Sequence, residues 1–594
     1  MASRLAQSHQ YLPAMTKEKI ADAFEAIARL LELKGENPFK IRAYTQAARA
    51  LETLAEPLDT LIAEERLTAI EGIGKATGEK ITELHTTSRL PYLDNLREEF
   101  PPDILTLFDI QGLGAKKIKI LWDSLKVHSI TSLERACKEG KVATLPGFGE
   151  KTAANILKGI DHMRAHAGEF RFGDIASLAE SLLDDLRGHP AANQSAIAGS
   201  YRRKKEVVHD LDFIVSSSQP ADVMDFFSTH PLVVNILAKG ATKSSVILKN
   251  GIQCDLRVVA GKEFPFALNY FTGSKEHNVR IRSRALARGW SLNEYRFSPA
   301  DGRELREPIP EILEENDIYH ALGLDPVPPE LREDRGEIDA AEKHSLPALI
   351  EWSNLRGIFH NHTTASDGRA SLDDMVAAAK ELGLEYLGIA DHSKASFQAN
   401  GLDEKRLAEQ TARIAELNAD DKEFRIFTGV ECDILKDGTL DFPDEVLASL
   451  DYVVASVHSS FTMPQAEMTK RIIRAMENPN VTMLGHPTGR LLLTRDAYQL
   501  DIPAILDAAA ATGTIIELNA NPRRLDLDWR WWPLAKEKGV KCAINPDAHS
   551  TEGLQDVIFG VGIARKGWLT KDDVVNTQSL ARITHTLQEK RARK

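Results

Sequence analysis

Two aspartates open the stretch of the chain whose residue types are best suited to chemistry. Asp210 and Asp212 begin an apolar run, residues 211–215, that predicts a buried strand. Because side chains two residues apart on a strand share one face, the two carboxylates should lie side by side. Such a pair repels unless a cation lies between them, and oxygen-only ligands favour Mg²⁺ or Mn²⁺.

A third acid and a polar turn extend this pattern. Asp255 lies within a later apolar run, residues 252–259, and Gly199-Ser200 followed by four basic residues precedes the first two acids. The N–H groups and hydroxyl of such a turn can face an anion, so the combination suits two-metal phosphoryl transfer. A lone D-x-D pair is more often a solvated strand end, but the turn and the later aspartate favour the catalytic interpretation.

The segment after these strands combines aromatic and basic side chains. Tyr270 and Phe271 precede a turn at Gly273, and the helical pattern that follows projects Asn278, Arg280, Arg282 and Arg284. An aromatic step beside a polar, basic helix suits a nucleotide sugar and the edge of a base pair. The alternative is a packed aromatic pair beside a solvated helix, and the segment alone does not decide between the two.

Three G-x-G turns, each followed by a helical pattern, lie within about 80 residues near the N-terminus. In a helix–hairpin–helix, glycines let the backbone turn so that N–H groups at the second helix meet a phosphate without reading sequence. One such turn is most often a simple helix connection, but three favour nucleic-acid binding. The residues concerned are Gly72, Gly74, Lys75, Gly112, Gly114, Gly147 and Gly149.

Beyond residue 355, seven short apolar runs alternate mostly with helical patterns, which predicts a parallel barrel. Polar residues follow the strand ends, where catalytic groups meet in such a barrel. Imidazoles with carboxylates and without thiols hold Mn²⁺, Zn²⁺ or Fe²⁺, and a set of this size suits two or three ions that activate water for phosphoester hydrolysis. Each histidine alone is more often a hydrogen-bonded loop residue. The set is His360, His362, Asp367, His392, Glu431, His458, His486, Asp547 and His549.

Length and composition bound these interpretations. A chain of 594 residues predicts several domains, and its four scattered cysteines, without a C-x-x-C pair, argue against disulfides and cysteine-bound zinc. No apolar run approaches the roughly 20 residues that span a bilayer, and the start lacks a secretory pattern, so we expect a cytoplasmic protein without a membrane partner. The net charge of −13 means that any nucleic-acid site must be a local basic surface.

The first 340 residues resemble a family X DNA polymerase, and the whole chain resembles the bacterial form with a C-terminal PHP domain. GSYRR, DLDFIV, QCDLRVV and YFTGS carry the first likeness, and HNHTTASDG, ADHS, GVECDI and NPDAHS carry the second. The resemblance implies a multidomain fold: all-α helix–hairpin–helix N-terminal domains, an α+β nucleotidyltransferase-like palm, and a distorted (β/α)7 barrel.

The resemblance also implies domain boundaries. We expect a helical 5′-phosphate and lyase-like domain, a helix–hairpin–helix domain, a catalytic palm, a nucleotide-selection subdomain, an extended and exposed linker, and the PHP domain. Their ranges are 1–100, 101–168, 169–262, 263–334, 335–354 and 355–594, respectively. Independently of the resemblance, the prolines and dense charge of residues 321–354 favour an extended, exposed connector there.

Residue roles follow from the same resemblance. The three acids Asp210, Asp212 and Asp255 would hold two Mg²⁺ or Mn²⁺ ions, and Asp255 would help to deprotonate the primer 3′-hydroxyl. The incoming triphosphate would be bound by Gly199, Ser200 and Arg203. The sugar pocket would be lined by Tyr270, Phe271 and Gly273, and the nascent base pair would contact Asn278 and Arg282.

Two further activities are implied. Lys80 matches a lysine that forms a Schiff base with 5′-deoxyribose phosphate; its alternatives are a solvated helix lysine or a phosphate contact. The PHP part resembles a 3′→5′ exonuclease with apurinic-site and 3′-end trimming activity, dependent on a cluster of two or three Mn²⁺ (or Zn²⁺) ions. All nine ligand positions of that family are filled here.

We therefore expect a monomeric polymerase that fills short gaps in repair, acting on gapped or primed DNA and deoxynucleoside triphosphates, with a built-in nuclease. Three departures from the family, His209, Gln253 and Lys275, bear on nucleotide affinity, fidelity and sugar selectivity. The alternatives are a PHP phosphoesterase whose polymerase half only binds DNA, and a non-catalytic DNA-binding scaffold.

Overall fold

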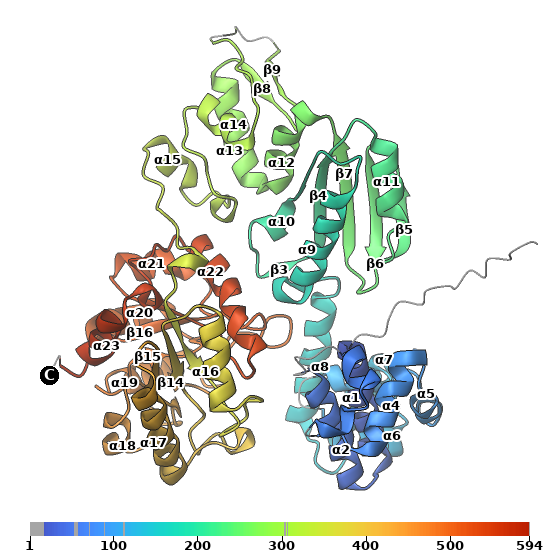
Figure 1. The fold of residues 1–594 in the computed structure, drawn as a ribbon, viewed down its shortest axis with the longest axis vertical. Helices are drawn as coiled ribbons and strands as arrows, with labels where there is room; N and C mark the ends of the chain where they lie inside the picture. Colours follow the sequence, from blue (N-terminus) through green and yellow to red (C-terminus); the bar gives the residue numbers. More distant parts are fainter. Residues whose placement is uncertain are drawn as a thin grey trace, which may run out of the picture. The chain divides into compact units, whose positions relative to one another are not determined.

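The chain forms two compact units, residues 1–167 and 168–594 (Figure 1). The structure is a computed structural model that describes residues 17–52, 58–70, 72–87, 89–110, 113–301, 305 and 307–592. Gly112, one of the predicted DNA-binding residues, lies outside the described residues. Within the described part, no helix has the length and apolar character needed to cross a membrane.

The first unit is helical, as the sequence predicts. Its helices are α1 (Lys17–Lys34), α2 (Pro38–Glu52), α3 (Leu58–Ala63), α4 (Lys75–Thr87), α5 (Pro91–Glu98), α6 (Ala115–Leu125), α7 (Ile130–Lys138) and α8 (Glu150–Ala165). A short 3₁₀ turn precedes each predicted G-x-G pattern, at Leu67–Ala69, Ile104–Asp109 and Val142–Thr144, and a helix follows it. The helix begins at the residue after the second glycine, at Lys75, Ala115 and Glu150. The helical spacing of α1 directs Phe24, Ile27 and other apolar side chains into the core.

The palm is a five-stranded sheet with the order β2-β4-β7-β6-β5. The strands are β2 (Gln194–Ile197), β4 (Asp210–Ser216), β5 (Val233–Lys239), β6 (Lys243–Leu248) and β7 (Gln253–Val259). Alternation along β4 gives the sheet two faces. Leu211, Phe213 and Val215 join the core with α9 (Phe172–Gly188) and α11 (Pro220–Ser228). The intervening residues lie on the other face, where Ile214 packs with α12 (Phe264–Thr272) and the two aspartates begin the strand.

The next elements, α13 (Lys275–Ala287), β8 (Trp290–Leu292), β9 (Phe297–Pro299) and α14 (Glu315–Ala321), share a separate core. Residues 335–354, expected to be an extended, exposed linker within the proline- and charge-rich stretch 321–354, are largely exposed but not extended. They contain α15 (Glu337–Glu342), and Glu337 is fully buried with its carboxylate 2.7 Å from His277 Nδ1. Glu337 therefore has a buried partner, which composition alone does not reveal, whereas Asp339, Glu342 and Lys343 are exposed.

The C-terminal part contains only parallel strand pairs within its two sheets, ordered β10-β11-β12 and β13-β14-β15-β16-β17 among the described residues. The strands are β10 (Gly357–Asn361), β11 (Tyr386–Ile389), β12 (Arg425–Thr428), β13 (Glu431–Asp433), β14 (Val454–Ser456), β15 (Met483–Leu484), β16 (Ile515–Asn519) and β17 (Cys542–Asn545). The predicted run FRIFTGVEC provides both β12 and β13, interrupted at Gly429-Val430.

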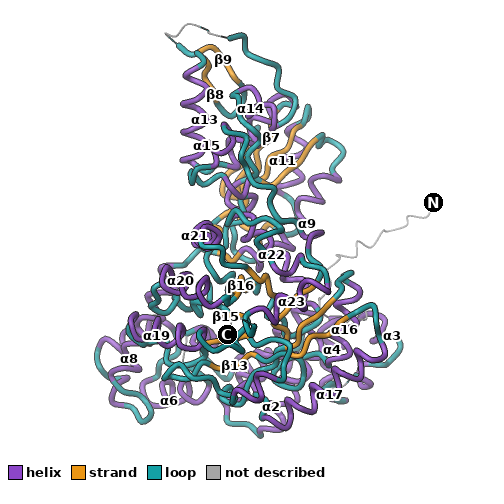
Figure 2. Tube along the Cα trace, turned by 90° about the vertical axis from the view of Figure 1, so that its left-hand side faces the viewer, coloured by secondary structure: helices purple, strands orange, loops and turns teal. Residues whose placement is uncertain are grey.

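Isolated bridges complete the ring of strands. His392 pairs with Glu431 between the two sheets, and Asn361 pairs with Ala548 where the last strand returns to the first. Helices cover the outside, among them α16 (Leu372–Glu381), α17 (Glu404–Asp420), α19 (Gln465–Met476), α20 (Ile502–Thr512), α22 (Val557–Lys566) and α23 (Leu580–Glu589) (Figures 1 and 2). The predicted distorted barrel is confirmed, and so are the helical N-terminal part and the α+β palm.

Candidate active sites

The structure brings the three palm aspartates onto one face of the sheet. Strands β4 and β7 are parallel, and Asp212 lies directly opposite Asp255 in their register. Asp210 precedes Asp212 by two residues and shares its face. Gly199 makes room for this group: its φ is +64°, and a Cβ there would lie 2.4 Å from Asp212 Oδ2.

Asp255 already has cationic and polar partners. Lys243 Nζ, from β6, lies 2.8 Å from Asp255 Oδ2, and Gln253 Nε2 donates to Asp255 Oδ1 at 3.0 Å. Lys243 was not predicted as a site residue, because only the pairing of β6 with β7 brings it to the acids. Its ammonium provides the positive charge that a cluster of carboxylates requires. Gln253, a departure from the family, hydrogen-bonds the acid directly.

Electrostatics distinguish the three acids. Burial, together with the charges of Asp210 and Asp255, raises the pKa of Asp212 to about 7. Burial and the charge of Asp255 also raise the pKa of Asp210. Burial acts in the same direction on Asp255, but the hydrogen bonds from Lys243 and Gln253 hold its pKa below the usual value. This is the pattern expected for carboxylates that lie close together, and their mutual repulsion favours a cation between them.

Mg²⁺ binding to the palm should therefore weaken as the pH falls through about 7. A proton on Asp212 must leave before the carboxylate can hold a cation, so the apparent Kd should rise about fivefold from pH 7 to pH 6 and change little above pH 8. Isothermal titration calorimetry measures this in a His360→Ala background, chosen to weaken the barrel site. Asp212→Asn should lack the pH step; an affinity of the parent independent of pH would contradict the assignment.

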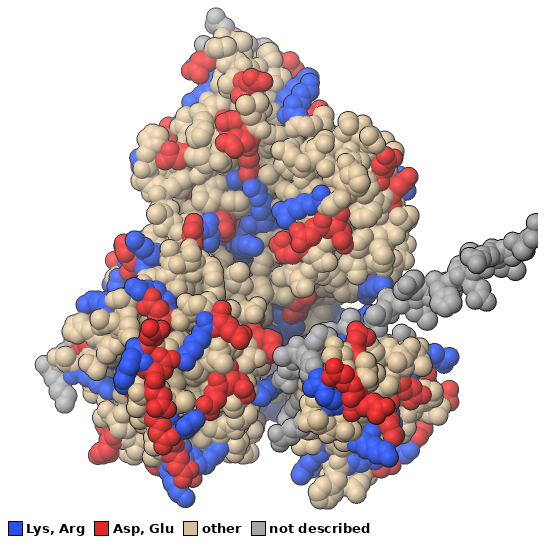
Figure 3. All heavy atoms as spheres, in the orientation of Figure 1, with Lys and Arg blue, Asp and Glu red and all other residues tan. Residues whose placement is uncertain are grey.

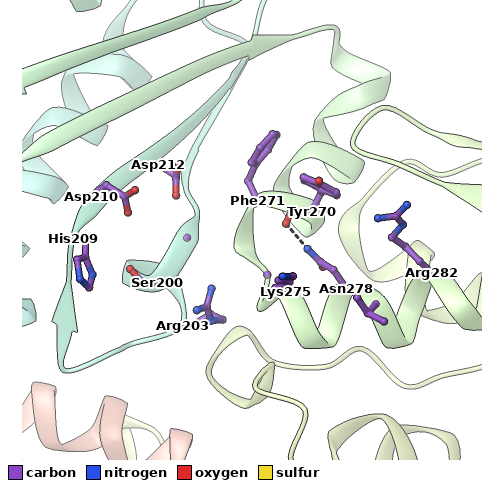
Figure 4. Close-up of a pocket in the computed structure, with 13 residues that line it drawn as sticks. Ser200, Arg203, His209, Asp210, Asp212, Tyr270, Phe271, Lys275, Asn278 and Arg282 are labelled. Atoms are coloured by element: carbon purple, nitrogen blue, oxygen red, sulfur yellow. Dashed lines mark hydrogen bonds between the residues drawn. The ribbon is translucent and has the colours of Figure 1, made fainter. Parts of the chain in front are cut away.

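A cavity of about 730 Å³ adjoins Asp210 and Asp212. It is lined by all the predicted nucleotide-contacting residues, namely Gly199, Ser200, Arg203, Tyr270, Phe271, Gly273, Asn278 and Arg282. Figure 4 shows the two acids on one side and the side chains of α12 and α13 on the other, with the hydrogen bond from Asn278 Nδ2 to the Tyr270 carbonyl (2.7 Å). Basic side chains gather in the hollow between α10 (Gly199–Arg202) and α13 (Figure 3).

Arg203 is held by two acceptors at this cavity. Its Nε donates to Glu333 Oε1 at 3.0 Å, and its Nη1 donates to the carbonyl of Thr272 at 2.5 Å. Gly273, with φ +70°, allows the turn that approaches the guanidinium. Arg203 is thus oriented before any anion arrives, which lowers the ordering cost of binding one.

The remaining departures also line the cavity. The His209 side chain is 69% exposed and its Nε2 lies 3.2 Å from Glu169 Oε1, so it is directed to this neighbour at the rim. Lys275 begins α13 and adds a positive charge near the turn at Gly273. Both side chains are exposed, so neither fills the cavity.

In the barrel, the nine predicted ligands converge in one cluster. They form four overlapping groups in which each residue offers a ligand atom, with the atoms of a group within 4.8 Å of one another. Glu431 lies at the centre: its carboxylate oxygens are 2.8 Å from His392 Nδ1, 2.8 Å from His486 Nε2 and 3.2 Å from His458 Nε2. His362 Nε2 lies 3.1 Å from Asp547 Oδ1.

The residues present fit a metal cluster. Several of their ligand atoms are buried without a hydrogen-bond partner of good geometry, namely His360 Nε2, His362 Nδ1 and Nε2, His392 Nδ1, His486 Nδ1 and Glu431 Oε2. Buried polar atoms left unpaired are costly unless something else binds them. Imidazole and carboxylate ligands without thiols suit Mn²⁺ or Zn²⁺.

Charges at the rim of this cluster are arranged as ion pairs. Burial opposes ionisation of both partners, yet the contact between His549 Nε2 and Asp367 Oδ1 (3.4 Å) lowers the pKa of Asp367 to about 2 and raises that of His549 to about 9. Binding of cations should therefore release protons from imidazoles.

Second-layer residues orient these ligands, and the sequence reasoning missed them. Glu517 is fully buried in β16, with its Oε2 2.6 Å from His360 Nδ1, and Asp433 Oδ1 lies 3.1 Å from His458 Nδ1. Such carboxylates fix the ring orientation and tautomer of a ligating histidine. The signal for Glu517 was an acid within an otherwise apolar run, IIELN. Arg524 also reaches the cluster: its Nε lies 3.4 Å from Asp547 Oδ2, and its buried Nη1 has no hydrogen-bond partner.

In the helical unit, those predicted DNA contacts that the structure describes lie at or just before helix N-termini. Gly74, Gly114 and Gly149 directly precede α4, α6 and α8, and a Cβ at Gly114 or Gly149 would meet open space. Gly72 and Gly147 have φ of +91° and +79°. Lys80 lies on α4, with its Nζ 5.1 Å from the centroid of the Tyr92 ring and 3.3 Å from the carbonyl oxygen of Ala76.

Comparison with known proteins agrees with this organisation. Residues 15–90 match the helix-hairpin-helix domain, 104–161 the SAM-like helix-hairpin-helix tandem, 267–333 the DNA polymerase beta thumb and 359–521 the PHP domain. The chain is 39% identical to the DNA polymerase/3′-5′ exonuclease PolX of Bacillus subtilis over 568 residues, which cover 95% of this chain and 98% of that protein.

Each half also has relatives of its own. DNA polymerase lambda of Rattus norvegicus is 23% identical over 332 residues, 51% of this chain and 54% of that protein. A probable phosphatase of Thermoanaerobacter is 29% identical over 247 residues, 39% of this chain and 94% of that protein. The domains therefore define a nucleotidyltransferase joined to a PHP barrel. The chain belongs to the bacterial family X DNA polymerases with a C-terminal PHP domain.

Proposed function

We propose that this chain fills short gaps in DNA during repair and trims 3′ ends with its PHP domain. The observation that carries the first activity is the single cavity that joins Asp210 and Asp212 to Arg203, Asn278 and Arg282. The converging ligands of the barrel carry the second. We place these reactions in the cytoplasm, on gapped or primed DNA, with the chain acting as a monomer.

In the palm, the chain's own groups position the reactants. The Arg203 guanidinium, held by Glu333 and the Thr272 carbonyl, would donate its remaining N–H groups to phosphate oxygens, and Asn278 and Arg282 would contact the nascent pair. Asp255 would accept the proton of the primer 3′-hydroxyl, which requires Lys243 to turn away. Mg²⁺ or Mn²⁺ held by the three carboxylates would offset the triphosphate charge and lower the pKa of the attacking hydroxyl.

In the barrel, Glu517 and Asp433 would keep His360 and His458 in the orientation that ligation needs. The unpaired Nη1 of Arg524 would donate to an oxygen of the scissile phosphate. Mn²⁺ or Zn²⁺ ions held by the nine ligands would supply an activated water for hydrolysis of the terminal phosphodiester. The helix N-termini at the G-x-G turns would bind backbone phosphates of the duplex.

The proposal is tested on a labelled primer in a one-nucleotide gap with a downstream 5′-phosphate. With Mg²⁺ and nucleotides, the primer should grow by one residue; with Mn²⁺ and without nucleotides, it should shorten from its 3′ end. Shortening without extension would favour a phosphoesterase whose polymerase half only binds DNA. Binding without either reaction would favour a scaffold.

We also propose that Lys80 forms the Schiff base with 5′-deoxyribose phosphate. Its amine lies over the Tyr92 ring of α5, and its own helix, α4, follows the first G-x-G turn. Lys80→Arg keeps the charge but should lose the borohydride-trapped adduct with 5′-deoxyribose-phosphate DNA, while gap filling persists. Trapping of Lys80→Arg at the wild-type level would show that another amine reacts.

A further inference from the structure

One fully buried lysine of the PHP part contacts residues beside the polymerase cavity. Lys566 is the last residue of α22, and its side chain has no exposed surface. Its ammonium donates to Glu333 Oε1 at 2.5 Å, to the Arg203 carbonyl at 3.1 Å and to the Glu330 carbonyl at 3.4 Å. The ammonium also lies 4.6 Å from the centroid of the Trp529 ring.

Glu333 connects this lysine to the nucleotide cavity. The same oxygen, Oε1, accepts from Lys566 Nζ and from Arg203 Nε. Lys566 therefore contacts Arg203 in two ways. It shares the Glu333 carboxylate with the Arg203 side chain, and it donates a hydrogen bond to the Arg203 main-chain carbonyl. The ammonium thus joins α22 to Glu333, which lies 233 residues earlier in the chain, and to Arg203, which lies 363 residues earlier.

A general packing role does not account for this arrangement. Burying an ammonium is unfavourable unless it is paired, and burial lowers the pKa of Lys566 to about 8 although Glu333 opposes that change. Apolar residues of similar size commonly stabilise an interface as well as a buried ion pair does. An ion pair also fixes the relative positions of its partners. Here the residue whose position it fixes is Arg203.

We propose that Lys566 is a positioning residue for nucleotide addition, which fixes Glu333 and the Arg203 main chain and so holds the Arg203 guanidinium toward the incoming triphosphate. The PHP part would then complete the polymerase's nucleotide site in addition to carrying its own reaction. This inference rests on the proposed polymerase function. It does not depend on the metal content of the barrel.

Arg565 offers a matched control on the same helix. Its Nε donates to Glu330 Oε1 at 2.8 Å and its Nη1 donates to the Ile350 carbonyl at 3.0 Å. It joins the same two parts of the chain, but its hydrogen bonds go to Glu330 and Ile350 and not to Arg203 or Glu333. A general loosening of the interface should therefore appear in Arg565→Met as well as in Lys566→Met.

Single-nucleotide incorporation into gapped DNA tests the inference. Lys566→Met should raise KM for the nucleotide about tenfold with a smaller change in kcat, and should leave the rate of 3′-end trimming unchanged. Arg565→Met should leave KM near the wild-type value. Glu333→Gln should raise KM, and adding Lys566→Met to it should have less than the additive effect, because both act through one carboxylate.

The outcomes separate this inference from the proposed function. An unchanged KM in Lys566→Met, an equal rise in Arg565→Met, or additive effects with Glu333→Gln would each overturn the inference while gap filling stands. Loss of trimming together with the rise in KM would show a folding defect of the barrel and would also overturn it. Absence of incorporation by the wild-type chain would instead refute the polymerase function itself.

Discussion

Asp255→Asn should abolish gap filling, lowering kcat/KM for nucleotide incorporation by about 10³-fold or more, equivalent to about 4 kcal/mol of transition-state stabilisation. Asparagine has the size of aspartate, and its side-chain carbonyl can still accept the hydrogen bond from Gln253. It removes the charge that faces Asp212 across β4 and β7 and the base that would receive the primer proton. Extension of a labelled primer in a one-nucleotide gap measures the effect.

A matched control is Asp225→Asn on the same palm. Asp225 is exposed and pairs with Lys239, outside the set of residues that line the cavity. This substitution also removes one negative charge, so it should retain gap filling within about twofold. Incorporation by Asp255→Asn at a rate near that of Asp225→Asn would exclude Asp255 from the reaction.

His360→Ala should abolish trimming of 3′ ends by about 10³-fold or more. His360 is fully buried, its Nδ1 faces Glu517, and its Nε2 lies 3.2 Å from Glu431 and 3.7 Å from Asp547. Its loss removes a ligand shared by two of the four groups and leaves the Glu517 carboxylate without its imidazole partner. Release of nucleotides from a labelled 3′ end in Mn²⁺ is the measurement.

Because removal of a buried side chain can unfold the barrel, a second variant is needed. His549→Ala changes a partly exposed ligand and should give the same loss of trimming without a fall in thermal stability. His585→Ala, on the exposed side of α23 and paired with Glu589, should leave trimming unchanged. Trimming that survives in both His360→Ala and His549→Ala would place the nuclease site elsewhere.

The fold was predictable where periodicity and burial coincide. The spacing of apolar residues in α1 predicts its buried stripe, and alternation along β4 places Asp210 and Asp212 away from the core that holds Leu211 and Phe213. The nine predicted barrel ligands could be picked out because they lie in or shortly after the apolar runs that form strands, and strand ends converge in a parallel barrel. These features depend only on residue types and their spacing within short stretches of the sequence.

Contacts between distant segments could not be predicted in this way. Lys243 reaches Asp255 only through the pairing of β6 with β7, and Glu333 reaches Lys566 only when α22 packs on the polymerase part. The charged segment around Glu337 resembles an exposed linker until His277 is found against it. In each case one partner is a charged residue that composition assigns to the surface, although a distant partner permits its burial.

The central claim is that two separate metal sites perform two reactions in one chain. The most direct measurement assays extension and trimming by Asp255→Asn and His360→Ala on the same gapped duplex. The account predicts that Asp255→Asn trims the 3′ end and does not extend it, and that His360→Ala extends the 3′ end and does not trim it. Loss of both reactions in either folded variant, or retention of both, would contradict it.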